Sequence, residues 1–191
     1  MAISTNSTGS SSARMNEASN QQYLKANGAV AEINGIRIEK SVIINRDRAD
    51  LYHFWRNFRN LPQIMKHLEE VRVLSPTRSH WVAKAPVGTK VEWDAEVTHD
   101  QENEMIAWRS LEGATVANAG SVRFLHFAEH ETEVRVSLEY APPGGRLGAF
   151  IATLFGENPE QQITEDLVQF KHMMESDFKP VDKDAASEEV I

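Results

Sequence analysis

Apolar and polar residues alternate along the middle of the chain, between residues 68 and 140. In the segment 89–97, Val91, Trp93 and Ala95 share one face, and Glu92 and Asp94 face the other way. A period of two residues is typical of a strand that buries one face and exposes the other. The segments with this pattern cover residues 68–75, 78–85, 89–97, 103–110, 120–127 and 132–140. Because most of the connections between them are short, they predict an antiparallel meander.

A strand and two helices are expected before this meander. Residues 34–45 are predicted to form the first strand of the sheet. Asp47 is then a suitable N-cap for a helix, because apolar residues recur at helical spacing from Leu51 to Phe58. Asn60 is expected to cap a second, short helix, with a proline near its start, where no backbone donor is lost.

A long helix is expected after the meander. Asn158, Pro159 and Gln161 form a helix start signal, with a capping side chain at the first position and proline directly after it. The apolar residues that follow, at steps of four, three and four, are Ile163, Leu167, Phe170 and Met174. The order of these elements predicts an α+β fold, in which a curved antiparallel sheet wraps a long C-terminal helix and encloses a cavity.

The two ends of the chain differ from this central domain. Residues 34–178 are expected to form one domain, residues 1–33 a disordered arm rich in Ser, Thr and Asn, and residues 179–191 an acidic disordered tail. The net charge is −8, and ten acidic and only three basic residues lie between positions 157 and 191. This charge argues against a nucleic-acid partner, which needs a basic surface. No apolar run resembles a membrane span or a secretory signal, so a cytoplasmic location is expected.

Aromatic residues are the main candidates for a binding site. Trp81, Trp93 and Trp108 lie in the predicted strands, where they either line a cavity or fill the core. The full set of expected ligand-binding residues is Trp81, Trp93, Trp108, Phe124, Val136, Tyr140, Phe150, Leu154, Phe170 and Met174.

Two polar residues are the candidates for chemistry. If Trp93 and Trp108 both face inward, Arg109 lies opposite Glu92 on the solvent face as an ion pair. In the other register, Arg109 points inward and anchors a carboxylate or carbonyl group of a ligand. His126 shares a face with Phe124 near the end of the sheet, where it either binds water or backbone, or donates a hydrogen bond to a ligand or acts on it as a general base. The chain has no cysteine and no zinc motif, so neither a metal nor a cofactor is expected.

Five segments resemble one known family. They are FWRNFRNLPQIMKHLEEV (54–71), SHWVAKAPVGTKVEWDAEV (79–97), IAWRSLEGATVANAGSVRF (106–124), TEVRVSLEYAPPGG (132–145) and FGENPEQQITEDLVQFK (155–171). Together they resemble the polyketide cyclase/dehydrase group of the START/Bet v 1-like superfamily, which includes coenzyme Q-binding START-like proteins. The resemblance implies a helix-grip fold around a hydrophobic ligand, and no catalytic signature of the cyclases is present to transfer.

Three functions follow from this reading. The first is binding of a hydrophobic small molecule, such as a polyketide, quinone, lipid or isoprenoid, as a carrier or chaperone. The alternatives are a cofactor-independent cyclase or dehydratase, and an interaction module that makes transient contact with a membrane or a membrane protein. A cavity lined only by carbon favours the carrier, and a polar cluster inside it favours the enzyme. Residues 147–156 are expected to cover the cavity mouth, either as a lid that turns at the Gly156–Pro159 break or as a static kink.

Overall fold

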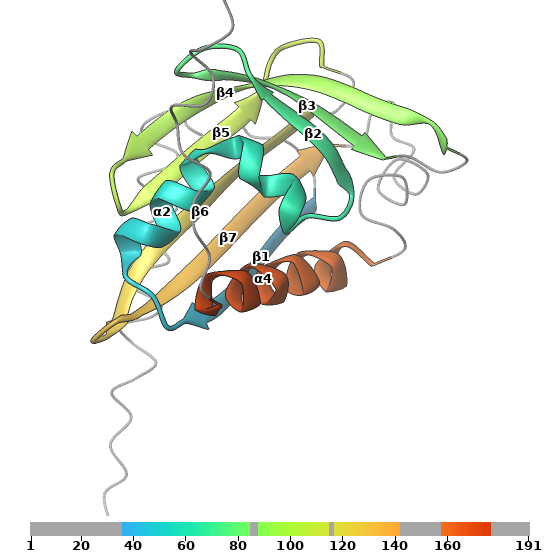
Figure 1. Ribbon diagram of the computed structural model, residues 1–191. Helices are drawn as coiled ribbons and strands as arrows, with labels where there is room; N and C mark the ends of the chain where they lie inside the picture. Colours follow the sequence, from blue (N-terminus) through green and yellow to red (C-terminus); the bar gives the residue numbers. More distant parts are fainter. Residues whose placement is uncertain (1–35, 85–87, 115–116, 142–157, 177–191) are drawn as a thin grey trace, which may run out of the picture.

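A computed structural model describes residues 36–84, 88–114, 117–141 and 158–176. Within these residues, the elements in chain order are β1 (Ile36–Ile44), α2 (Arg48–Arg56), the 3₁₀ helix η1 (Phe58–Gln63), β2 (Leu68–Val73), β3 (Arg78–Lys84), β4 (Lys90–Gln101), β5 (Met105–Ser110), β6 (Ala117–Ala128), β7 (Glu131–Ala141) and α4 (Pro159–Glu175). The seven strands form one antiparallel sheet in the order β1-β7-β6-β5-β4-β3-β2. The sheet is curved, and α2, η1 and α4 lie on its concave side (Figure 1). This is the predicted helix-grip architecture.

The sheet is a meander in which the first strand, β1, pairs with the last strand, β7. Each strand from β2 to β7 pairs with the next one along the chain, and β1 pairs with β7 along its whole length, from Ile36 opposite Tyr140 to Ile44 opposite Thr132. Inward-facing residues of the paired strands, such as Val122, Phe124 and Val134, are almost fully buried. The alternating pattern therefore predicted the buried face correctly.

Two strands are longer than the sequence pattern indicated. Strand β4 continues through polar residues to Gln101, with a bulge between Val97 and His99, and the turn comes only at Asn103, whose φ is 61°. Asparagine tolerates this left-handed conformation better than most residues. Strand β6 begins at Ala117, within a segment expected to be a loop, because its small residues pair with β7. The polar residues at the end of β4 and the small residues at the start of β6 resemble the composition of a loop, which is why the sequence pattern did not assign them to strands.

The short helix after α2 differs from the prediction. It begins at Phe58 as a 3₁₀ helix with Asn57 at its N-cap, so Asn60 lies inside it and does not cap it. The buried Asn60 side chain instead donates a hydrogen bond to the carbonyl oxygen of Phe54, at 2.9 Å. This bond ties η1 back to α2, which places both elements above the sheet.

Helix α4 closes the open side of the sheet. It begins as predicted, because Asn158 Oδ1 accepts a hydrogen bond from the Gln161 amide at 3.1 Å. The helix packs on β1, and Phe170, with no exposed surface, contacts Phe54 and Trp55 of α2 at ring-centroid distances of 5.1 and 5.3 Å. Within the described residues, no helix has the length and apolar character needed to cross a membrane.

Candidate functional site

An apolar cavity lies between the concave face of the sheet and the helices. Its volume is about 90 Å³, on a measure by which one water molecule needs roughly 10–15 Å³. It therefore has room for several water-sized groups, whereas a cavity that holds a benzene molecule measures about 150 Å³, so a larger ring system requires side chains of the wall to move apart. The lining residues come from both layers of the fold and are Trp55, Phe58, Leu61, Ile64, Met65, His67, Leu68, Trp81, Trp93, Trp108, Asn118, Val136, Leu138, Ile163, Asp166 and Leu167.

Tryptophan is the dominant residue of the cavity wall. All four tryptophans of the chain line it. Trp81 and Trp93 are directly opposite each other on β3 and β4, and their rings stack with centroids 6.0 Å apart and planes 16° from parallel. Phe58 of η1 packs against Trp81 at 5.7 Å. The cavity therefore offers flat aromatic surfaces, which suit a ring-containing or conjugated ligand better than a polar one.

The indole ring of Trp108 packs directly against a glycine of the neighbouring strand. Gly120 of β6 lies opposite Trp108 of β5, and a Cβ atom built at Gly120 would be 2.6 Å from Trp108 Cζ2 and 3.0 Å from the Ser137 carbonyl oxygen. Non-bonded carbon atoms need about 3.5–4.0 Å. The missing side chain thus creates the space that the indole ring occupies.

Gly120→Ala is expected to lower the free energy of unfolding by about 1–3 kcal/mol, because the added methyl group overpacks this contact. Urea unfolding measures the change. The matched control places Gly120→Ala in a Trp108→Phe background, where the indole atoms that clash are absent, and the alanine should cost less there. An equal cost in both backgrounds would show that Trp108 does not depend on Gly120.

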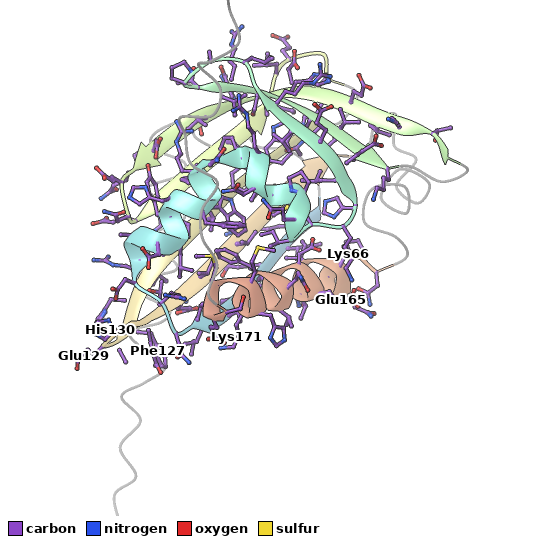
Figure 2. The ribbon with its side chains drawn as sticks, viewed as in Figure 1. Lys66, Phe127, Glu129, His130, Glu165 and Lys171 are labelled. Carbon is purple, nitrogen blue, oxygen red and sulfur yellow. The ribbon has the colours of Figure 1, made fainter. Side chains whose placement is uncertain are left out.

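One wall of the cavity carries a pair of titratable side chains. Asp166 of α4 is buried and His67, which precedes β2, is partly buried, and the distance between Asp166 Oδ2 and His67 Nδ1 is 3.5 Å. Gln162, one turn before Asp166, donates a hydrogen bond to its Oδ1 at 2.9 Å. Lys66 and Glu165, which precede His67 and Asp166 in the sequence, are labelled in Figure 2 and show where the segment before β2 approaches α4.

Burial shifts both groups of this pair toward their neutral forms. Desolvation raises the pKa of Asp166 to about 7, with a further increase from the charge of Glu165, and the Gln162 hydrogen bond, the charge of Lys66 and the Lys66 backbone amide oppose it. Desolvation, assisted by the charge of Lys84, lowers the pKa of His67 to about 4. Between these two pH values, the side chains form an uncharged acid–imidazole pair. A carboxyl group with a pKa near 7 can donate or accept a proton at neutral pH.

The structure brings some of the predicted binding residues together. Trp81, Trp93, Trp108 and Val136 lie on the cavity wall. Their contact with a ligand remains a prediction. Phe124, Phe170 and Met174 are buried in the core and do not line the cavity. The side chain of Tyr140 and the residues Phe150 and Leu154, together with the whole expected lid at 147–156, fall outside the described residues.

The two predicted polar candidates lie outside the cavity. Arg109 is exposed and pairs with Glu96 at 2.7 Å, not with Glu92, because β4 and β5 pair further along β4 than expected. His126 is exposed near the tip of the β6–β7 hairpin, opposite Thr132, where β6 bulges. The polar groups that line the cavity are instead His67, Asp166 and Asn118.

The sequence contains a signal for one of these missed residues. Asp166 follows Ile163 by three positions and precedes Phe170 by four, so it belongs to the apolar, inward-facing stripe of α4. An acidic residue on such a stripe indicates a buried carboxyl group. His67 is the last residue of the segment expected to form the second, short helix, and it lies off the apolar spacing of that segment, while Asn118 lies in a segment predicted to be a loop, so neither could be found in this way.

The fold and the cavity define the class of protein. A curved antiparallel sheet around a C-terminal helix, with an apolar cavity between them, is the START/Bet v 1-like helix-grip fold. The chain belongs to the family described as polyketide cyclase / dehydrase and lipid transport, which matches residues 44–168.

Individual relatives support this assignment. A protein of solved structure from Deinococcus radiodurans is 37% identical, covers 73% of this chain and 97% of its own, and superimposes with a TM-score of 0.62. An uncharacterized 17.2 kDa protein from Streptomyces lincolnensis is 28% identical over 145 residues, which are 73% of this chain and 89% of that protein. An aromatase/cyclase from Streptomyces sp. R1128 is 16% identical with a TM-score of 0.58 over 73% of this chain and 93% of its own, a likeness of fold alone.

Proposed function

We propose that this protein binds a hydrophobic, ring-containing small molecule in the cavity between the sheet and α4. The observation that supports the proposal most strongly is that four tryptophans line the cavity and that two of them, Trp81 and Trp93, stack on each other. Small-molecule sites are concave and mainly apolar, with a few polar groups that orient the ligand. The family, whose description includes lipid transport, is consistent with this function.

Tryptophan fluorescence tests the proposal directly, because every tryptophan of the chain lines the cavity. Titration with 1,4-naphthoquinone, a flat apolar quencher, is expected to quench the emission saturably, with a dissociation constant on the order of micromolar. A non-quenching aromatic competitor should restore the emission. Quenching that rises linearly with concentration, without saturation and without competition, would show collisions with solvent-exposed rings and would refute binding.

A second candidate function is proton transfer on the bound molecule. The observation that favours it is the buried pair Asp166 and His67 on the wall of an otherwise apolar cavity. A buried carboxyl group with a raised pKa is a common feature of catalytic sites. The family description names cyclases and dehydrases, and both reactions need a group that moves protons.

Hydrogen–deuterium exchange on a ketone separates the carrier from the enzyme. In D₂O, a proton removed from the carbon next to a carbonyl group is replaced by deuterium, so the ketone loses its methyl signal in the proton NMR spectrum. If Asp166 acts as a base, the protein should accelerate this exchange for 2-acetylnaphthalene, and Asp166→Asn should abolish the acceleration. Binding without acceleration would assign the protein to the carrier class.

A further inference from the structure

The cavity lining combines aromatic and polar side chains. Trp81, Trp93 and Trp108 line it from the sheet, and its titratable side chains are Asp166 on α4 and His67 before β2. The Asp166 side chain is 7% exposed and that of His67 is 14% exposed. A ligand that fills the cavity is therefore in reach of this pair, and the chemistry of the pair limits which ligands fit.

The groups around Asp166 do not provide a stable positive charge inside the cavity. His67 is neutral above a pH of about 4, since burial lowers its pKa. Lys66 and Glu165, the charged groups that act on Asp166 from the segment before β2 and from α4, carry opposite charges. Lys84 on β3 acts on His67, and its ammonium group donates a hydrogen bond to the Lys66 carbonyl oxygen at 3.2 Å. An anionic ligand would thus be buried without a partner, at high energetic cost.

A hydrogen-bond acceptor on the ligand fits this wall better than a cation. In its protonated form, the Asp166 carboxyl group donates one hydrogen bond. Trp55, 1% exposed and also on the cavity wall, has an indole N–H with no acceptor among the described residues. The Trp55 N–H is a buried donor, and a buried donor left unpaired costs roughly 1–3 kcal/mol. The Asp166 carboxyl group adds a second donor, whose proton goes either to His67 Nδ1, 3.5 Å away, or to a ligand. A carbonyl or ether oxygen would satisfy a donor of this kind, whereas an ammonium group has no acceptor lone pair.

We infer that Asp166, with His67 beside it, forms a subsite for an uncharged oxygen acceptor, and that the cavity selects neutral carbonyl-bearing aromatic molecules over carboxylates and amines. This inference rests on the proposed function, because it assumes that the cavity binds a ligand. It excludes free fatty acids and other lipids with an ionised carboxylate at this end. It also makes the affinity depend on the protonation state of a single side chain.

Four ligands of nearly the same shape test the inference by calorimetry. They are 2-acetylnaphthalene, 2-naphthoate, 1-(2-naphthyl)ethylamine and 2-ethylnaphthalene, which carry a neutral carbonyl group, an anion, a cation and no polar group. At pH 5.5, where Asp166 holds its proton, the ketone should bind most tightly and the carboxylate at least about tenfold more weakly. At pH 8.5, the ketone should lose at least about tenfold in affinity, because only the small protonated fraction binds it, whereas 2-ethylnaphthalene should lose less.

Two variants assign the pH dependence to Asp166. In Asp166→Asn, the side chain stays an uncharged donor at every pH, so the ketone should bind equally at pH 5.5 and 8.5. Glu165→Gln is the control, because it removes one negative charge from the exposed neighbour of Asp166 on the same helix. The ketone affinity of this variant should still fall as pH rises. The fall should begin at slightly lower pH, because the charge of Glu165 helps to raise the pKa of Asp166. Thermal unfolding of both variants checks that each of them is folded.

Each contrary result has a distinct meaning. At pH 5.5, equal affinity for all four ligands, or tightest binding of the amine or the carboxylate, would overturn the neutral-acceptor subsite and leave ligand binding intact. A pH dependence that persists in Asp166→Asn would overturn the role of Asp166. Failure of all four ligands to bind would refute the proposed function itself.

Discussion

Phe170→Ala is expected to lower the free energy of unfolding by about 3–5 kcal/mol, which is the typical cost of removing a fully buried aromatic ring. Phe170 has no exposed surface and connects α4 to α2 through its contacts with Phe54 and Trp55. Removing the ring leaves a void between the two elements that cover the sheet. Chemical denaturation measures the loss.

Val168→Ala is the matched control for this prediction. Val168 lies on the same helix, two residues away, but is 42% exposed, so its truncation should change stability by no more than about 0.5 kcal/mol. If Phe170→Ala were as mild as Val168→Ala, α4 would not be held to the domain by this aromatic contact, and the helix would be a detachable cover.

Asp166→Asn is expected to stabilise the protein at alkaline pH, by on the order of 3–4 kcal/mol at pH 8. The pKa of Asp166 is raised from an ordinary value of 3.8 to about 7. Between these values, the folded protein keeps a proton that the unfolded chain has released, so Asp166 makes stability fall as pH rises from about 4 to about 7. The asparagine side chain has no charge to bury, and its Oδ1 can still accept the hydrogen bond from Gln162.

The pH profile of the variant provides a second, sharper test. The pKa of His67 is lowered from 6.5 to about 4, so His67 makes stability rise with pH between those values. In the wild type, the two opposite slopes largely cancel from about pH 4 to 6.5. In Asp166→Asn, the slope from His67 should appear alone, and stability should rise across that range. Parallel pH profiles for wild type and variant, measured by urea unfolding, would contradict the burial of an uncharged pair.

A residue that lowers stability at neutral pH is a candidate for function. Stability and activity often trade off at sites where a protein keeps a buried ionisable group. Asp166 fits this description, because an apolar residue at its position in the stripe of α4 would avoid the cost of ionisation. The expected stabilisation and the expected change in ligand affinity of Asp166→Asn are therefore two consequences of one buried carboxyl group.

Most of the fold could be predicted from the sequence, because the period of the apolar residues differs between strands and helices. The alternation around Trp93 indicated a strand with one buried face, and Asn158 marked the start of α4. The register of β4 against β5 could not be predicted, because β4 continues through polar residues to Gln101 and the turn therefore comes later than its composition indicated. That shift gives Arg109 the partner Glu96. The bulge between Val97 and His99 changes the pairing by one further residue and leaves little trace in a sequence pattern.

The site could be predicted in part. The strand tryptophans were recognisable as candidates because large aromatic residues on a buried face either fill the core or line a cavity. Their arrangement depends on neighbours that a pattern does not specify, such as Gly120 beneath Trp108. The polar wall was missed because it joins residues 99 positions apart, Asp166 on a helix and His67 in a connection. Only the tertiary structure brings them together.

A crystal structure of the protein with bound 2-acetylnaphthalene tests the central claim most directly. We expect the naphthalene ring to lie against Trp81, Trp93 and Trp108, with its carbonyl oxygen within hydrogen-bonding distance of the Asp166 carboxyl group at pH 5.5. The claim would be contradicted by a cavity filled by the protein's own side chains with the ketone absent from it, or by a ketone that occupies the cavity with its oxygen turned away from Asp166.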